Sequence, residues 1–305
     1  MKPPRRVVWG VGLVLLLLVT AAIGFYERPV SYFNGLLDVQ MHLAGAHSRW
    51  TKVNGIRIHY WVEGPDNGSP VVLVHGLGGH AEDWHNLAPY LVRDGFRLYI
   101  PDLPGFGGSG KPKDFSYSIV DEANVVVGFM DAVGLKQVDL GGHSMGGWIV
   151  QRIAFEHPDR IRKLMVFDSA GVYDKPAWKT ALFTPTTPGE LNTLDALLMP
   201  HPPQVPGFIA RDILRVSHQR SWVIQRAMQS MLTGRDTTDS ELPQLKMPFL
   251  IVWGDQDHIT PLPDGEKMHQ LVPQSQLDVV EGCGHLAPVQ CADRIGPVVA
   301  SFLKR

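Results

Sequence analysis

The architecture of this chain can be read outward from the pentapeptide GHSMG at residues 142–146. Residues 138–141 form a short apolar run that predicts a strand, and residues 146–156 predict a helix. A serine between two glycines at such a strand-to-helix turn is presented above the sheet edge, and the glycines let neighbouring backbones pass closely. The start of the helix also favours negative charge beside the hydroxyl. Ser144 is therefore predicted to be a nucleophile, and the simpler alternative is that it only caps the helix.

Strand and helix patterns alternate on both sides of this turn. Continuous apolar runs predict buried parallel strands, and residues 56–63 read differently, as an early antiparallel edge strand. The alternation predicts an α/β fold with a mostly parallel central sheet and helices on both faces. The other expected strands are 71–75, 97–101, 138–141, 163–168, 249–253 and 276–280, and the expected helices are 84–93, 119–133, 146–156, 265–271 and 291–303.

The alternation stops between about residues 171 and 243. This segment is rich in proline, shows no clear strand, and carries a helical pattern over residues 208–231. A helical insert after the sixth strand of such a sheet is expected to form a cap over the carboxyl edge of the strands. Ligands bind at that edge in open α/β sheets.

A serine hydroxyl needs a base to take its proton, and the base needs an acid to orient it. His285 follows the last expected strand, which is the place for the base, although an ordinary loop histidine is the alternative. The acid has three candidates. Asp257 is preferred; Asp255 is read as a turn-capping residue, and Asp168, which ends the strand before the insert, is held in reserve.

The negative oxygen that forms during acyl transfer needs two backbone N–H donors. Met145, directly after the nucleophile, supplies one, and Leu77, in the HGLGG loop of residues 75–79, is the best placed for the other. Leu77 and Trp148 are also expected to line the substrate pocket, with a place in the core as the alternative for Trp148. Asp102 is interpreted as structural, shaping a tight loop rich in proline and glycine.

Composition excludes several classes of protein. The net charge is −2, and no basic stripe with interleaved aromatic residues suggests a nucleic-acid partner. The two cysteines, Cys283 and Cys291, form no CxxC motif, which argues against a zinc ribbon or a dithiol redox site. Their spacing leaves open whether they are bonded to each other. We expect no metal and no organic cofactor, and the sequence does not indicate an oligomeric state.

The N-terminus carries an apolar run over residues 7–25. At 1.5 Å per residue, about 20 such residues cross a hydrocarbon core of about 30 Å, so a single-pass anchor is expected, with a cleaved signal peptide as the alternative. The cations ahead of the run predict a cytoplasmic N-terminus and a catalytic domain on the other side of the membrane. Residues 27–49 show helical spacing of apolar residues, which suits either a helix in the membrane interface or one packed on the domain. The preceding cations are Lys2, Arg5 and Arg6.

The motifs HGLGG, DLPGFGGSG, GHSMGG, WGDQD and GCGH stand in the order typical of the α/β-hydrolase family, which this chain resembles over most of residues 50–305. The resemblance implies Ser144, Asp257 and His285 as the triad and Leu77 and Met145 as the oxyanion donors. The chain is most similar to membrane-anchored monoacylglycerol lipases and related bacterial lipases, through its apolar N-terminus and the TPGE element at residues 187–190. The expected division is a membrane anchor at 1–26, an amphipathic segment at 27–49, the hydrolase core at 50–170 and 244–305, and the cap at 171–243.

The resulting hypothesis is a serine hydrolase that cleaves carboxylic esters of lipid-like substrates, a monoacylglycerol lipase or an esterase. Two alternatives remain. The first is a carbon–carbon bond hydrolase of aromatic ring-fission products, which uses the same triad and adds polar pocket residues, a role that Arg152 could fill. The second is a non-catalytic binding protein on a hydrolase scaffold.

Overall fold

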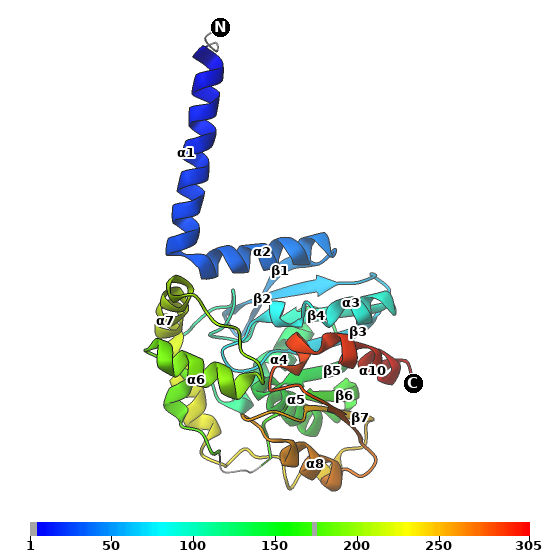
Figure 1. Cartoon of the computed structure of the whole chain (residues 1–305). Coiled ribbons are helices and arrows are strands. Elements are labelled where there is room, and N and C mark those ends of the chain that lie inside the picture. The colour runs from blue at the N-terminus through cyan, green and yellow to red at the C-terminus, as the bar shows by residue number, and fades with distance from the viewer. Residues whose placement is uncertain (1–4, 173–175) are drawn as a thin grey trace.

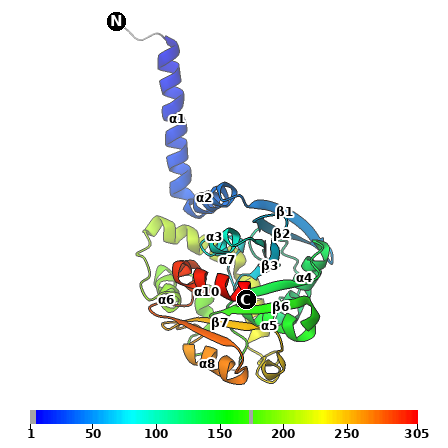
Figure 2. The same ribbon diagram turned by 90° about the vertical axis from the view of Figure 1, so that its right-hand side faces the viewer.

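The computed structural model describes residues 5–172 and 176–305, and side chains from residue 16 onward together with that of Val14. Its centre is an eight-stranded sheet with the order β1-β2-β4-β3-β5-β6-β7-β8 (Figures 1 and 2). β1 and β2 pair antiparallel, as do β2 and β4, and every later pairing is parallel. The strands are β1 His47–Val53, β2 Ile56–Glu63, β3 Ser69–Val74, β4 Phe96–Pro101, β5 Val138–His143, β6 Ile161–Phe167, β7 Phe249–Gly254 and β8 Gln276–Val280.

Helices cover both faces of the sheet because its inner strands are apolar on both sides. Val71, Val72, Leu73 and Val74 in β3 are all fully buried, as expected for a parallel strand between two helical layers. Residues of α4, α5 and α8 pack on one face, and residues of η1, α3, α9 and α10 pack on the other. These elements are η1 Ala81–Trp84, α3 Ala88–Arg93, α4 Ile119–Ala132, α5 Met145–Glu156, α8 Leu262–Leu271, α9 Ala287–Gln290 and α10 Ala292–Lys304.

The predicted α/β-hydrolase fold is confirmed, with one difference at the edge of the sheet. Residues 56–63 form β2, but β2 lies inside the sheet, because β1 adds one more antiparallel strand beside it. β1 has the sequence HSRWTKV, and most of its side chains are exposed. A solvated edge strand has no buried face, so it lacks the apolar pattern on which the sequence prediction depended.

The segment between β6 and β7 is helical, as predicted for the cap. It contains η3 Thr180–Phe183, α6 Pro188–Leu198, α7 Gly207–Met231 and η4 Leu242–Gln244. The TPGE element begins α6: the Thr187 side chain accepts a hydrogen bond from the Glu190 N–H, and the Glu190 carboxylate accepts one from the Thr187 N–H. This reciprocal cap fixes the start of the helix.

Two helices precede β1, and α1 projects away from the rest of the chain (Figures 1 and 2). α1 spans Arg5–Glu27, and α2 spans Pro29–Leu43. α2 packs on the domain through Leu37 and Met41, which are buried, and it contacts α7 and η1. One face of the predicted amphipathic segment therefore lies against the protein.

The predicted single-pass anchor is wrong for the part of the chain that the structure describes. No helix there combines the length and the apolar character that a membrane span requires. The prediction depended on the apolar run of residues 7–25 alone, and an apolar run by itself does not establish a membrane span. The membrane orientation predicted from the charges depended on this anchor, so that prediction is wrong as well. Lys2, one of those charges, lies outside the described residues.

Candidate active site

Ser144 occupies a sharp turn between β5 and α5. Its backbone has φ 54° and ψ −119°, an unusual conformation for a residue with a side chain. A Cβ atom at Gly142 would lie 2.2 Å from the Gly146 carbonyl oxygen, and one at Gly146 would lie 2.3 Å from the Val74 carbonyl oxygen. Only glycine fits at either position, because these contacts are with backbone atoms that cannot move aside. The turn therefore holds Ser144 in place at the carboxyl edge of the sheet.

The structure brings the three predicted residues into one hydrogen-bonded line. The Ser144 Oγ lies 2.8 Å from the His285 Nε2, and the His285 Nδ1 lies 2.8 Å from an Asp257 carboxylate oxygen. The carboxylate can only accept, so Nδ1 carries the proton and Nε2 is free to accept from the serine hydroxyl. Asp257 follows β7 and His285 follows β8, so parallel strands deliver both groups to the edge where Ser144 lies.

Asp257 is buried, and its carboxylate is fully engaged. One oxygen accepts the backbone N–H groups of Ile259 and Thr260 at 2.7 and 3.0 Å. The other accepts from the histidine and lies 2.8 Å from the Thr260 hydroxyl oxygen. These bonds fix the orientation of the carboxylate toward His285.

Thr260 is a site residue that sequence reasoning missed. Its Oγ1 lies within 3.2 Å of three groups: the Asp257 carboxylate, the Asp168 carbonyl oxygen and the His285 Nδ1. The hydroxyl has a single hydrogen, so it donates to one of the two oxygens. The only signal in the sequence is a threonine three residues after an aspartate, a spacing at which a local hydrogen bond is common.

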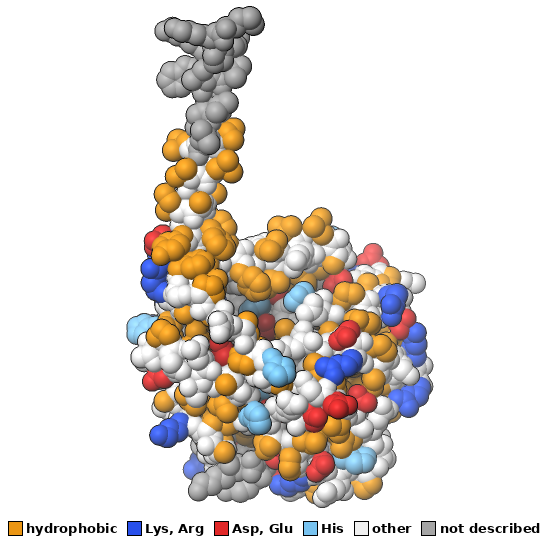
Figure 3. Space-filling view, in the orientation of Figure 1, with side chains coloured by type: hydrophobic (Ala, Val, Ile, Leu, Met, Phe, Trp, Pro, Cys, Tyr) orange, Lys and Arg blue, Asp and Glu red, His pale blue; other side chains and the backbone are white. Residues whose placement is uncertain are grey.

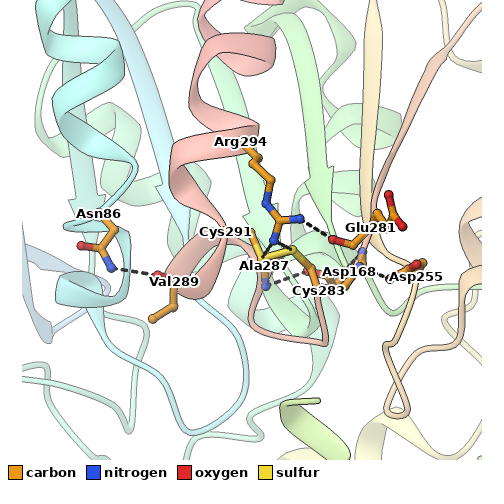
Figure 4. The surroundings of a disulfide bond; sticks show 11 residues. Asn86, Asp168, Asp255, Glu281, Cys283, Ala287, Val289, Cys291 and Arg294 are labelled. Atoms are coloured by element: carbon orange, nitrogen blue, oxygen red, sulfur yellow. Dashed lines mark hydrogen bonds between the residues drawn. A yellow bond between two sulfur atoms is a disulfide. The ribbon is translucent and has the colours of Figure 1, made fainter. Parts of the chain in front are cut away.

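The two reserve candidates for the acid have other partners. The Asp168 carboxylate accepts the N–H of Gly254 at 2.8 Å and that of Ala287 at 3.3 Å, and it has no hydrogen bond to His285. Burial and the neighbouring charge of Asp257 raise the pKa of Asp168 well above its usual range. Asp255 accepts the N–H of Gly282. Both carboxylates brace the loop that carries His285, and Figure 4 shows both of them near the disulfide.

Cys283 and Cys291 form a disulfide that encloses His285 in a short loop. Both sulfur atoms are buried, and the Arg294 guanidinium donates to each of them, at 2.8 and 2.9 Å (Figure 4). Arg294 also donates to the carbonyl oxygen of Glu281. The pairing that the sequence left open is thus present, and it ties the loop to the start of α10.

His143 supports the backbone of His285 through a hydrogen bond. The His143 Nε2 lies 2.6 Å from the His285 carbonyl oxygen, so this nitrogen donates. Burial, together with the nearby His285 ring, lowers the pKa of His143 to about 3. His143 is therefore neutral at physiological pH and acts as a hydrogen-bond donor to the backbone of the loop.

The loop after β3 passes directly beside Ser144. A Cβ atom at Gly76 would lie 3.0 Å from the Ser144 Cβ, which places the following residue, Leu77, next to the nucleophilic oxygen. Within the described residues, neither the Leu77 nor the Met145 N–H has a hydrogen-bond acceptor. Both donors are thus available to a ligand oxygen.

Asp102 shapes the proline- and glycine-rich loop that follows it, as its structural interpretation predicts, and it also holds the end of the loop after β3. Its carboxylate accepts the Ala81 N–H at 2.7 Å, the Gly108 N–H at 2.8 Å and the His59 Nδ1–H at 2.7 Å. Burial opposes the charged form, but the hydrogen bonds and the nearby histidines lower the pKa of Asp102 to about 2.

An apolar cavity of about 240 Å³ lies beside Thr260 and Ile259. Trp148 lines it, although its side chain is mostly buried and its indole N–H donates to the Asp236 carbonyl oxygen at 2.7 Å. Leu77, the other predicted pocket residue, does not line this cavity. The remaining wall of the cavity comes largely from the cap and includes Trp178, Met228 and Met231.

Comparison with known proteins agrees with this architecture. A family model described as the alpha/beta hydrolase fold matches residues 69–223 and 233–290. The chain is 27% identical to Lipase 1 of Psychrobacter immobilis, over 92% of this chain and 89% of that protein. It is 28% identical to 2-hydroxymuconate semialdehyde hydrolase of Pseudomonas putida, over 77% of this chain and 87% of that protein. Among solved structures, a bacterial membrane phospholipase A superposes with a TM-score of 0.83, at 28% identity and 97% coverage of both chains.

Proposed function

Since this chain belongs to the α/β-hydrolase family and is a hydrolase, we propose that it cleaves carboxylic esters of lipid-like molecules, as a monoacylglycerol lipase or a related esterase. The observation that carries the proposal is the line from Ser144 through His285 to Asp257, with two N–O distances of 2.8 Å. The apolar cavity beside Thr260 supports an acyl group as the part of the substrate that is bound. A bacterial lipase among the relatives and a phospholipase A among the structural neighbours are consistent with it.

In the proposed reaction, the Ser144 Oγ attacks the ester carbonyl carbon while its proton passes to the His285 Nε2. The carbonyl oxygen becomes negative and accepts the N–H groups of Leu77 and Met145. Asp257 stabilises the imidazolium that forms. The carbon–oxygen bond then breaks, and His285 returns the proton to the leaving alcohol. Water, deprotonated by His285, attacks the acyl-enzyme, releases the acid and restores the serine.

A second candidate is the hydrolysis of a carbon–carbon bond in ring-fission products, because the relatives include 2-hydroxymuconate semialdehyde hydrolase. Arg152 does not support it. Its guanidinium pairs with Glu156 at 2.7 Å and lies 3.6 Å from Glu241, so it is held on the outer side of α5 by other charges. The third candidate, a binding protein without catalysis, leaves the aligned hydrogen bonds of Ser144 without a use.

A substrate panel tests the proposal. The full chain is assayed against p-nitrophenyl esters and monoacylglycerols of increasing acyl length, and against 2-hydroxymuconate semialdehyde. We expect ester turnover with an optimum in acyl length, because the cavity beside Thr260 has a limited volume. Turnover of the ring-fission product with no ester hydrolysis would favour the second candidate, and no turnover of either would favour the third.

A further inference from the structure

A second cavity, of about 340 Å³, lies between α2, the hairpin β1–β2, the loop after β3 and α7. Its volume is within the range of small-molecule sites. Its wall carries more charge than that of the cavity beside Thr260, where Asp264 is the charged residue: it includes Asp38, His80, Glu82 and Arg220. Figure 3 shows a hollow beneath α1 and α2 with histidine and acidic side chains in it. None of these residues belongs to the proposed triad.

This cavity adjoins the proposed reaction centre. His80 follows Leu77 by three residues, and three peptide units span at most about 11 Å. A Cβ atom at Gly78 would meet the Ile224 side chain of α7 at 4.0 Å. Arg220 precedes Ile224 by one helical turn, about 5–6 Å along α7, and so lies on the same face. The loop after β3 therefore connects the proposed oxyanion donor Leu77 to the wall of this cavity.

One side of the cavity is positive. Arg220 is half-buried, and its guanidinium forms no ion pair or hydrogen bond with any residue that the structure describes. Lys111 is its neighbour: burial and the charge of Arg220 lower the pKa of Lys111. Lys111 does not line the cavity, and the Asp102 carboxylate also acts on its charge, so Arg220 alone offers the site for an anion. A guanidinium matches a phosphate group in particular.

The other side carries two carboxylates, those of Asp38 and Glu82, and the imidazole of His80. The Glu82 carboxylate accepts the Trp61 indole N–H and pairs with the His80 Nδ1, both at 2.7 Å. Burial opposes charge on His80, but its hydrogen bond to Glu82 and the nearby carboxylates raise its pKa to about 9. Asp38, on α2, faces Glu82, and burial together with the charge of Glu82 raises the pKa of Asp38. A cation bound at this pair would relieve the repulsion between the two carboxylates.

We propose that this cavity, bounded by Asp38, Glu82, His80 and Arg220, binds the zwitterionic headgroup of a phospholipid ester. The phosphate lies at Arg220, and the terminal ammonium lies at Asp38 and Glu82. The inference rests on the proposed ester hydrolysis and specifies which lipid is cleaved. A neutral glycerol headgroup would leave the guanidinium of Arg220 unpaired.

Matched substrates test it. The full chain is assayed with 1-octanoyl-glycerophosphoethanolamine and with 1-octanoylglycerol, which share the scissile ester. Arg220→Gln is expected to lower kcat/KM for the phospholipid about tenfold, mainly through KM, and to leave the glycerol ester within twofold. Asp38→Asn is expected to act on the ethanolamine lipid but not on its lysophosphatidate counterpart, which lacks the ammonium. Arg211→Gln, an exposed cation on the same helix, is the control and is expected to change neither rate.

Binding separates this inference from the proposed reaction. Calorimetry with glycerophosphoethanolamine, which has no acyl ester, is expected to show binding to the wild type and at least tenfold weaker binding to Arg220→Gln. Equal effects of Arg220→Gln on both esters, or no calorimetric difference between the two proteins, would overturn the headgroup site while leaving ester hydrolysis intact. Headgroup binding without turnover of either ester would overturn the proposed reaction instead.

Discussion

Cys283 and His285 lie in one short loop, and the disulfide from Cys283 to Cys291 closes that loop around the histidine. The same loop is held by the Asp168 carboxylate through the Ala287 N–H, and by His143 through the His285 carbonyl oxygen. The position of the imidazole therefore depends on a covalent link and on hydrogen bonds made by His143 and Asp168. This arrangement leads to the first prediction.

Replacing both cysteines by serine is expected to lower the free energy of unfolding by about 2–3 kcal/mol. The bond limits the conformational entropy of the unfolded chain, and its removal restores that entropy. The loss stays moderate because the closed loop is short. The turnover of an ester should fall as well, since His285 gains freedom to leave Ser144. Denaturant unfolding and kcat measure the two effects. An unchanged kcat in the serine variant would show that the hydrogen bonds alone position the histidine.

Three aspartate variants separate the proposed acid from its neighbours. Asp257→Asn is expected to lower kcat by about 10⁴-fold, because an amide can donate to Nδ1 and so favours the wrong tautomer of His285. Asp255→Asn should stay near the wild-type rate, since among the described residues its carboxylate accepts only from the Gly282 N–H. Asp168→Asn should act mainly on stability. Mild and equal losses for Asp257→Asn and Asp255→Asn would contradict the assignment.

Thr260 is expected to position the acid and the base. Thr260→Val keeps the shape of the side chain but removes the hydroxyl that lies 2.8 Å from Asp257 and 3.2 Å from His285. We expect kcat to fall about tenfold with KM little changed, and Thr260→Ser to restore most of the rate, because a bond that orients a catalytic group affects the chemical step. A loss of stability with an unchanged kcat would assign Thr260 a purely structural role.

Glu122, on α4, predicts a pH dependence of stability. Its carboxyl group is buried, neither oxygen has a hydrogen-bond partner within the described chain, and burial raises its pKa well above the usual value. The folded state holds the proton more tightly than the unfolded state, whose pKa is about 4.3. Stability is therefore lost as the pH rises above that value toward the raised pKa.

Glu122→Gln removes this titration and keeps the size of the side chain. The variant should gain stability relative to the wild type as the pH rises from 4.5 to 8, which urea unfolding at several pH values can measure. Parallel stability curves for the two proteins would show that Glu122 titrates normally.

The features that could be predicted from the sequence are those whose constraints are local. The glycines around Ser144 follow from the geometry of one turn, and the strand order brings the ends of β5, β7 and β8 to one edge, so Asp257 and His285 lie near Ser144. The TPGE element likewise encodes the start of α6 in four consecutive residues.

The features that could not be predicted from the sequence depend on contacts between distant segments. β1 is too polar to be seen as a strand, and the Cys283–Cys291 bond depends on a Cα separation of 6.5 Å that spacing alone cannot give. The charged cavity needs α2 to lie over the β1–β2 hairpin and brings Asp38 to Glu82, 44 positions further along the sequence. The predicted membrane span was wrong: it depended on one apolar run, and no helix in the described part of the chain qualifies as a span.

The most direct test of the central claim is covalent labelling of Ser144. A fluorophosphonate probe is incubated with the wild type and with Ser144→Ala, and the modified peptide is identified by mass spectrometry. If Ser144 is the nucleophile activated by His285, the wild type carries one adduct on residue 144 and loses its ester hydrolysis, while Ser144→Ala shows neither labelling nor hydrolysis. A Ser144→Ala protein that still reacts with the probe, or a wild type that does not, would contradict the account.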